Sequence, residues 1–339
     1  MSHSKCHMVP LAREAAMSNR NPLAGWDTDV AAYLANRRAL GRAYDNDEYS
    51  LNRLRRFLAQ SNASDLNEPL FSRWRASFYR ASNRTRVMRE RAVYKFCRYR
   101  RRSNPKCFLP DPSLFTHPKP LPLPRIIERE QVVQLLNYAS ALMPTSRDPL
   151  RPAVLRLAIL LLYTTGLRRG ELVRLPLADV DAQRGVLFVR DSKFHKSRWV
   201  PVSPSVRSEL RRYLDARRRA GVDCRPKAPL ICHGRGSAYT GVGFGRTLAE
   251  LLDAVGVRDA DGRRPRVQDF RHSFAVAALL RWYENAADVQ VNLQKLALYM
   301  GHVSIVSTAY YLRWMPAVVA RAGERFGRSF GQVLEGGAS

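Results

Sequence analysis

Three short clusters in the second half of the chain hold side chains that could together cut a phosphodiester bond without a metal ion. Such a reaction needs positive hydrogen-bond donors on the two non-bridging phosphate oxygens, a nucleophile, and an acid for the leaving oxygen. Arginine suits the first task because its planar guanidinium binds phosphate through two bonds and stays charged. Arg168, three residues before Glu171, supplies one such group. Arg271, near the start of an apolar helical stretch, supplies another.

The third cluster places a histidine and a tyrosine within one predicted helical hairpin. His302 follows Gly301, and Tyr311 comes nine residues later. Each cluster alone also has a plainer interpretation. Arg168 and Glu171 fit a surface ion pair, which contributes little energy. His302 fits a helix cap, and Tyr311 fits a half-buried core aromatic, so the functional interpretation depends on the clusters occurring together.

Together and in this order, the clusters resemble the motifs of the tyrosine recombinase (phage integrase) family. The family's G-L-R-x-[SG]-E-L, H-x-L-R-H-x-F-A and L-G-H are present as residues 166–172 (GLRRGEL), 268–275 (QDFRHSFA) and 300–302 (MGH). The family's following tyrosine is Tyr311, with Thr308 at the usual place three residues before it. The family's lysine, which lies in a β-hairpin after the first arginine, corresponds to Lys193, 25 residues after Arg168. The resemblance covers about residues 150–315.

This resemblance implies a site-specific DNA recombinase, of the kind encoded by transposons and integrative elements. Tyr311 would attack the scissile phosphate, form a 3′-phosphotyrosyl bond and free a 5′-hydroxyl, which then reseals the partner strand. Arg168 and Arg271 would hold the non-bridging oxygens while negative charge develops on them. Lys193 would protonate the leaving 5′-oxygen, and His302 would hydrogen-bond the phosphate. Bond energy is conserved in the exchange, so we expect no metal, ATP or other cofactor.

Two positions complicate this assignment. The first histidine of the family's second motif is Gln268 here, and an amide can donate a hydrogen bond to phosphate but cannot exchange a proton near neutral pH. We therefore expect a weakened site, since one general acid or base contributes about 10² to 10⁴-fold. Tyr310 is a rival nucleophile. Tyr311 is preferred because only it matches the nine-residue spacing from His302, and adjacent residues on a helix point about 100° apart.

The elements that must position these residues mix helices with a small sheet. Helical apolar spacing marks residues 154–163, 203–220, 242–257, 267–283 and 292–299, and short strands are predicted at 186–190 and 198–202, as a hairpin, and at 229–232. Neither GxGxxG nor GxxxxGK[ST] occurs, so nucleotide-driven chemistry is disfavoured. The sequence predicts an α+β fold with a mostly helical catalytic domain over residues 127–314.

The rest of the chain divides around a proline-rich stretch. Seven prolines between residues 104 and 126 predict a semi-extended linker, because proline breaks both helices and central strands. Residues 1–24 are expected to form an N-terminal tail. Residues 25–103 are predicted to be all helical, because Leu51, Leu54, Phe57 and Leu58 fall on one helical face and no strand alternation appears. This region resembles the family's core-binding domain. Residues 315–339 carry a roughly helical apolar stripe and are predicted to form a tail helix.

Charge points to a polyanionic partner. The formal net charge is +28, which favours nucleic acid first and an acidic membrane surface second. The helix predicted over residues 83–102 carries nine basic residues against one acid, Glu90. Like charges at this density repel unless phosphates neutralise them, although a solvated surface helix is the plainer interpretation. The DNA contacts predicted on this helix are Arg84, Arg86, Arg91, Lys95, Arg98, Arg100, Arg101 and Arg102.

Other classes of protein are disfavoured. The longest apolar run, residues 157–163, is far shorter than the ~20 residues needed to span a bilayer, and the polar N-terminus lacks the apolar stretch of a signal peptide. The five cysteines are widely spaced and include no C-x-x-C pair, which argues against a disulfide framework or a zinc site. We expect a cytoplasmic, nucleoid-associated bacterial protein that does not act at a membrane.

Partners follow from the same resemblance, and two alternative functions remain open. The expected partners are double-stranded DNA recombination sites, other copies of the chain in a tetramer linked through the tail helix, and sister recombinases. One alternative is a DNA-binding accessory protein that keeps the fold but has lost the chemistry, which Gln268 makes conceivable. The other is a type IB topoisomerase-like enzyme, which relaxes DNA by the same chemistry without exchanging partners.

Overall fold

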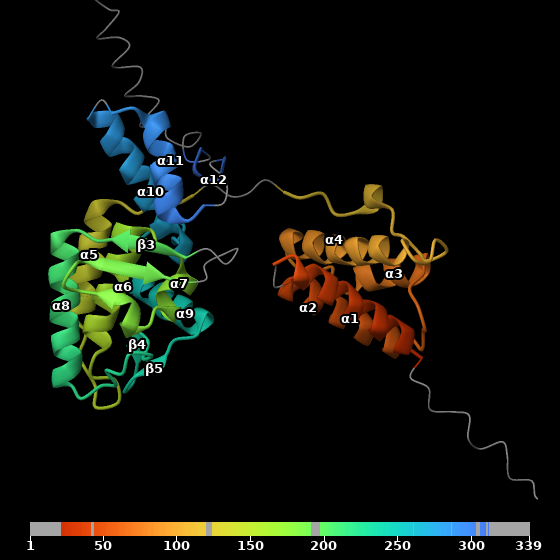
Figure 1. The fold of residues 1–339 in the computed structure, drawn as a ribbon, viewed down its shortest axis with the longest axis horizontal. Helices are drawn as coiled ribbons and strands as arrows, with labels where there is room; N and C mark the ends of the chain where they lie inside the picture. Colours follow the sequence, from red (N-terminus) through yellow and green to blue (C-terminus); the bar gives the residue numbers. More distant parts are fainter. Residues whose placement is uncertain are drawn as a thin grey trace, which may run out of the picture. The chain divides into compact units, whose positions relative to one another are not determined.

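The computed structural model describes residues 22–41, 44–119, 124–190, 197–259, 261–285, 287–302, 306–309 and 311. The chain forms two compact units, residues 1–121 and 122–339, each with a hydrophobic core of its own (Figure 1). Lys193, Tyr310 and the tail helix expected over residues 315–339 lie outside the described residues. In the described part of the chain, no helix combines the length and the apolar character needed to cross a membrane.

The regular elements that the structure describes in unit 1 are all helices, as the sequence predicts. Its helices are α1 (Ala24–Ala39), α2 (Asp45–Gln60), α3 (Glu68–Ala76) and α4 (Asn83–Arg100). Leu51, Leu54 and Leu58 on α2 are fully buried, one turn apart along a single face. They pack in one core with Trp26 of α1 and Phe96 of α4, whose rings meet edge to face at 5.0 Å.

The first part of the proline-rich stretch packs on unit 1 rather than forming an open connection. Its described residues contain one short helical turn, η1 (Pro112–Leu114), and Phe115 packs against the core of the unit. Glu90 of α4 is buried and accepts hydrogen bonds from the Thr116 backbone N–H at 2.7 Å and from Arg75 at 2.8 Å. The one acid of this basic helix therefore anchors the segment that leaves the unit.

Unit 2 holds the remaining elements. They are α5 (Arg129–Ala141), α6 (Arg151–Thr165), α7 (Arg169–Arg174), η2 (Leu177–Asp179), β1 (Val180–Asp181), β2 (Val186–Val189), β3 (Arg198–Pro201), α8 (Pro204–Arg219), β4 (Cys232–His233), β5 (Ser237–Ala238), α9 (Gly241–Ala254), α10 (Val267–Glu284), α11 (Val289–Met300) and α12 (Val306–Ala309). The fold is α+β with small antiparallel sheets, which confirms the predicted class.

The predicted hairpin forms, but the third predicted strand does not. Strands β1, β2 and β3 make one antiparallel sheet in which buried Leu187 pairs with buried Val200. At residues 229–232 the structure has instead an isolated bridge from Pro229 to Pro176, and β4 begins only at Cys232. Proline has no backbone N–H to donate, so a regular ladder cannot run through residue 229.

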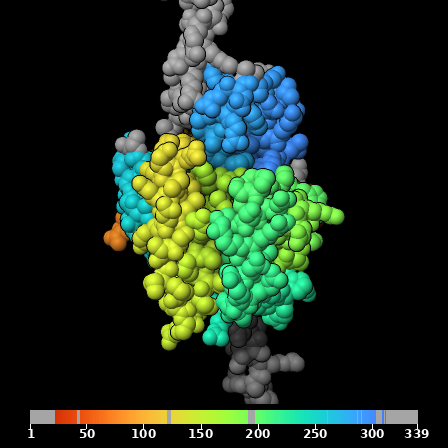
Figure 2. Space-filling model, turned by 90° about the vertical axis from the view of Figure 1, so that its left-hand side faces the viewer, coloured from red at the N-terminus to blue at the C-terminus, as the bar shows by residue number. Residues whose placement is uncertain are grey.

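Helix α6 is the central element of unit 2, and α5, α8 and α10 pack around it. Helices α10 and α11 form a block with a small core of its own, which includes Leu279, Leu296, Met300 and Tyr311. Figure 2 shows this block (blue) beside α5 (yellow) and α8 (green). The C-terminal end of α6 meets the block where Phe274 stacks on Tyr299, and this junction holds the candidate site.

Candidate active site

Arg271 ties together the ends of three helices. It lies on the second turn of α10 with only 1% of the residue exposed. One terminal nitrogen donates to the carbonyl oxygen of Gly166, just after α6, and the other donates to the carbonyl oxygen of Met300, at the end of α11, both at 2.6 Å. The guanidinium is therefore fixed in direction by backbone groups that lie more than 130 residues apart in sequence, since 300 − 166 = 134.

Two glycines of the sequence motifs make this arrangement possible. Gly166 and Gly301 have φ angles of +60° and +67°, a region that glycine enters without the steric cost of a side chain. A Cβ added at Gly166 would lie 2.5 Å from the Phe274 ring, and one added at Gly301 would lie 2.9 Å from the Arg198 guanidinium. Each position thus needs glycine both for its backbone conformation and for the close approach of a neighbour.

Arg168 is oriented by Glu171 and Gly301. Arg168 is the residue that precedes α7, and its guanidinium donates to Glu171 at 2.6 Å and to the Gly301 carbonyl oxygen at 2.9 Å. Glu171 also accepts the backbone N–H of Arg168 at 2.9 Å. The predicted pairing of these two residues is present, but it is a buried junction rather than a surface ion pair, since the Glu171 side chain is 2% exposed.

Arg198 is a further member of this network, although the sequence predicts it only as part of a strand. At the start of β3, it donates to both carboxylate oxygens of Glu171 at 2.9 and 3.1 Å, and to the Tyr299 carbonyl oxygen at 2.8 Å. Burial alone would raise the pKa of Glu171, but the bonds from Arg198 and Arg168 lower it to about 2. Glu171 is therefore ionised at neutral pH and holds two arginines beside the site.

The two motif arginines repel each other in the free protein. Burial, and then the charge of Arg168, lower the pKa of Arg271 to about 9. Arg271 is still charged at neutral pH, because that pKa remains above 7. An anion held by both guanidiniums relieves the repulsion, so the pair forms a site prepared for phosphate.

His302 is held as a neutral imidazole. Its Nδ1 atom lies 2.6 Å from the hydroxyl of Thr308, which is fully buried. Burial, together with the charges of Arg271 and Arg168, lowers the pKa of His302 to about 3. A hydroxyl that donates to Nδ1 leaves the ring proton on Nε2, where it can be donated to a phosphate oxygen.

Tyr311 lies between two histidines. Its hydroxyl is 3.0 Å from Nδ1 of His272, and its ring stacks on the ring of His302 with 6.4 Å between centroids. Tyr311 is 3% exposed. His272 was not among the predicted site residues, although it stands beside Arg271 in the second motif, and that position was the available signal.

Gln268 faces a basic groove beside the arginine pair. It is exposed on the first turn of α10 and lines a groove of about 740 Å³. Five arginines share the lining: Arg125, Arg168, Arg169, Arg264 and Arg266. Within the described residues, no group of His, Cys, Asp and Glu side chains is arranged to hold a metal ion. The groove thus presents positive charge and an amide next to the place prepared for phosphate.

The basic helix of unit 1 is not uniform. Six of its eight predicted DNA contacts have exposed side chains, namely Arg84, Arg91, Lys95, Arg98, Arg101 and Arg102, and Arg86 is half-buried. Arg100 differs, because its side chain is 10% exposed, donates to Asp29 and Asp65 at 2.6 to 3.0 Å, and lies over the Trp26 ring. Its charge is neutralised within the unit, so we leave Arg100 out of the proposed phosphate contacts.

Comparison with known proteins places the chain in a family. A model of the phage integrase family matches residues 125–316. The chain is 33% identical over 303 residues to y4rB of Sinorhizobium fredii (strain NBRC 101917 / NGR234), whose name assigns it to the integrases and recombinases, covering 88% of this chain and 96% of that protein. It is 30% identical over 257 residues to tyrosine recombinase XerD of Rhizobium meliloti (strain 1021), covering 75% and 76%. The chain belongs to the phage integrase family.

Two solved recombinase structures share the fold of this chain. XerH recombinase in a post-cleavage complex with palindromic difH DNA has a TM-score of 0.60 at 19% identity, covering 82% of this chain and 78% of that one. The Tn1549 transposon integrase in complex with transposon right-end DNA has a TM-score of 0.60 at 17% identity, covering 84% and 94%.

Family membership also settles the class of activity. The protein is a tyrosine-type site-specific DNA recombinase, an enzyme of DNA strand breakage and rejoining, as the motifs predict. The accessory-protein and topoisomerase alternatives are not favoured.

Proposed function

We propose that Tyr311 is the nucleophile that cuts and rejoins DNA at a recombination site through a 3′-phosphotyrosyl bond. The observation that carries this proposal is the convergence of Arg168, Arg271, His302 and Tyr311, which come from three separate segments of the sequence, at the junction of α6, α10 and α11. A phosphate between the two guanidiniums would lie beside the tyrosine hydroxyl. In-line attack then needs no metal, because the arginines carry the charge that develops on the phosphate.

The remaining steps follow from the other predicted residues. As the Tyr311 oxygen bonds to phosphorus, the bond from phosphorus to the 5′-oxygen breaks, and Lys193 supplies the proton that the leaving oxygen needs. His302 donates a hydrogen bond to a non-bridging oxygen, and Gln268 donates another from the groove side. Rejoining runs the same steps in reverse, with the 5′-hydroxyl of a partner strand as the attacking group.

A nicked suicide substrate tests the nucleophile, because loss of a short 5′-fragment traps the covalent complex. Wild-type protein should form a DNA adduct that survives a denaturing gel. Tyr311→Phe should abolish the adduct and leave binding nearly unchanged, whereas the matched control Tyr310→Phe should retain it. The reverse pattern would assign the reaction to Tyr310.

Double-stranded DNA is the proposed partner of both units. The XerH and Tn1549 structures contain recombinases bound to DNA. In this chain, the exposed basic side chains of α4 and the arginine-lined groove of unit 2 offer two surfaces that suit a phosphate backbone. With this partner, the enzyme would act at the nucleoid in the bacterial cytoplasm. Its substrates would be the recombination sites of a transposon or integrative element, and sister recombinases would take part where two unlike sites are joined.

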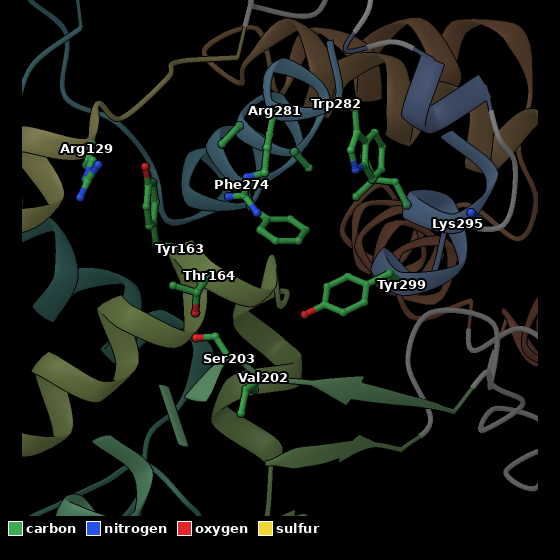
Figure 3. A pocket seen from close by; sticks show the side chains of 13 residues that line it. Arg129, Tyr163, Thr164, Val202, Ser203, Phe274, Arg281, Trp282, Lys295 and Tyr299 are labelled. Atoms are coloured by element: carbon green, nitrogen blue, oxygen red, sulfur yellow. The ribbon is translucent and has the colours of Figure 1, made fainter. Parts of the chain in front are cut away.

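The tail is proposed to link neighbouring copies into a tetramer. Unit 2 has an apolar cavity of about 650 Å³ beside α10 and α11, and Figure 3 shows Phe274, Trp282 and Tyr299 around it. We assign this cavity to residues 315–339 of a second copy, whose sequence carries an apolar stripe with Phe326 and Phe330. Aromatic anchors in a pocket are typical of such contacts. Arg129, Arg281 and Lys295 at the rim would face the acidic residues of that tail.

Truncation after Trp314 tests this contact. The shortened protein should bind one half-site normally but lose cooperative assembly on a full site in native gels, and lose recombination of two sites. The substitution Trp282→Ala, on the receiving side, should give the same result in the full-length chain. If the shortened protein cannot bind a single half-site, the tail belongs to the core of its own subunit.

A further inference from the structure

Asp269, His272 and Tyr311 form a chain of contacts that leads from a buried carboxylate to the proposed nucleophile. Nδ1 of His272 lies 3.0 Å from the Tyr311 hydroxyl, within hydrogen-bond distance. On the other side of the ring, Nε2 lies 4.0 Å from Oδ1 of Asp269, whose side chain is fully buried. Asp269 and His272 are one turn apart on α10, so the helix itself sets their spacing.

Asp269 is held rigidly in this position. Its carboxylate accepts the backbone N–H of Arg266 at 2.7 Å and caps the start of α10. It also accepts bonds from the Arg266 guanidinium, at 3.2 Å, and from the backbone N–H of Arg125, at 3.5 Å. A fixed negative charge beside Nε2 favours the imidazole tautomer that carries its proton there. The lone pair of Nδ1 then points at the tyrosine hydroxyl.

We propose that His272 is the general base that takes the proton of Tyr311, with Asp269 as the positioning residue that sets its tautomer. This role rests on the proposed function, because it requires Tyr311 to attack the phosphate. When the tyrosine oxygen bonds to phosphorus, its proton passes to Nδ1. The 5′-oxygen leaves with a proton from Lys193, and both protons return on rejoining. The histidine missing at position 268 thus leaves the activation of the nucleophile intact.

The charge state of His272 suits this task. Burial lowers the pKa of His272 below 6.5. Arg266, which precedes α10, and Arg271 on that helix act in the same direction, while Asp269 opposes them. From the other elements, the ring faces Tyr311 and the neutral His302. The imidazole is therefore unprotonated at pH 7 and able to accept a proton.

Single-turnover cleavage of the suicide substrate by His272→Asn tests the proposal. Asparagine places its amide oxygen close to the position of Nδ1, so it keeps the hydrogen bond to Tyr311 but cannot take the proton. We expect the cleavage rate at pH 7 to fall about 100-fold, in the range of a lost general base. DNA binding, measured by gel shift, should not change. The matched control His233→Asn alters an exposed histidine of β4, at the far end of unit 2 from α11 and α12, and should cleave normally (Figure 1).

Two further measurements separate a base from a structural residue. The defect of His272→Asn should shrink towards pH 9.5, because tyrosine ionises unaided near pH 10. A substrate with sulfur in place of the bridging 5′-oxygen needs no acid for its leaving group. This substrate should restore the cleavage rate of the Lys193→Ala variant but not that of the His272→Asn variant.

Three outcomes would overturn the role of His272: a normal rate for His272→Asn at pH 7, a defect that stays constant with pH, or restoration of His272→Asn by the sulfur substrate. Absence of any adduct with the wild-type protein would instead defeat the proposed function itself, so the two failures can be told apart.

Discussion

The arginines beside Tyr311, the proposed nucleophile, and those on α4 of unit 1 carry the same charge but are held in opposite ways. Arg271 is almost fully buried, and its two terminal nitrogens donate to backbone carbonyl oxygens. Arg98 is exposed on the surface of α4, and Arg102 is exposed just beyond the end of this helix. Burying a guanidinium costs solvation energy, which its hydrogen bonds must offset, but it fixes the direction of the donors. An exposed guanidinium keeps its solvation, and its positive charge can bind any phosphate group that comes near.

The contrast separates two tasks in one enzyme. Stabilising a transition state requires donors that are already aimed at the atoms where charge develops. Arg271 and Arg168, the proposed catalytic arginines, are fixed in this way by glycine carbonyl oxygens and by Glu171. Attracting a long polyanion requires only many positive charges on an accessible face. Changes in the first region should therefore act on the cleavage rate, and changes in the second should act on affinity and its salt dependence.

Replacing Arg271 by lysine should give the largest effect. Lysine has a single ammonium group, which cannot donate to the carbonyl oxygens of Gly166 and Met300 and bind phosphate at the same time. We expect the single-turnover cleavage rate to fall about 1000-fold, as for loss of an oriented donor to a developing oxyanion. Half-site binding should change little in a gel-shift titration.

The control for this substitution is Arg235→Lys, which changes an exposed arginine in the turn between β4 and β5 and should leave cleavage unaltered. If Arg271→Lys reduces binding as strongly as it reduces cleavage, Arg271 attracts DNA rather than orienting the phosphate, and the division of tasks is wrong.

An intermediate effect is expected at the C-terminal end of α4 and just beyond it. Replacing Arg98, Arg101 and Arg102 together by alanine should reduce the salt dependence of DNA binding, because log K falls with log salt at a slope of about −0.9 per phosphate contacted. The cleavage rate at saturating protein should be unchanged. The measurement is half-site affinity at several salt concentrations.

Arg100 provides the matched comparison on the same helix. Because Asp29 and Asp65 already neutralise it, Arg100→Ala should leave the salt slope unchanged. It should instead lower the free energy of unfolding by about 1 to 3 kcal/mol, since the bonds of a charged, largely buried group are lost. A flatter slope for Arg100→Ala alone would show that this residue reaches DNA after all.

These two regions also show what a sequence can and cannot predict. The fold class and the family could be predicted because glycine, arginine, histidine and tyrosine recur at fixed spacings within short segments. The inward turn of Arg100 could not, because nothing in the local sequence distinguishes Arg100 from Arg98 and Arg101. Asp29 and Asp65 come from segments 71 and 35 residues away from Arg100.

The same reason applies to the candidate site. The bonds of Arg271 to Gly166 and of Arg198 to Tyr299 join segments about 100 residues apart, and no local pattern specifies them. His272 was missed because its role depends on the Tyr311 hydroxyl, 39 residues later. The catalytic roles of the motif residues stay predictions until the variants are measured.

The smallest effect is expected at Gln268, at the border between the fixed site and the basic groove. Gln268→His adds a group that exchanges protons beside an unchanged arginine pair, so it should raise the cleavage rate without altering DNA affinity. If His272 already takes the proton of Tyr311, the gain should be only about two- to tenfold, far below the 10² to 10⁴-fold of a missing general acid or base. The gain is measured as the single-turnover cleavage rate of Gln268→His, alone and combined with His272→Asn. A gain of 100-fold or more in the wild-type background would mean that position 268 is the place of the missing base and that His272 is not. An equal or slower rate would mean that the chemistry does not use position 268.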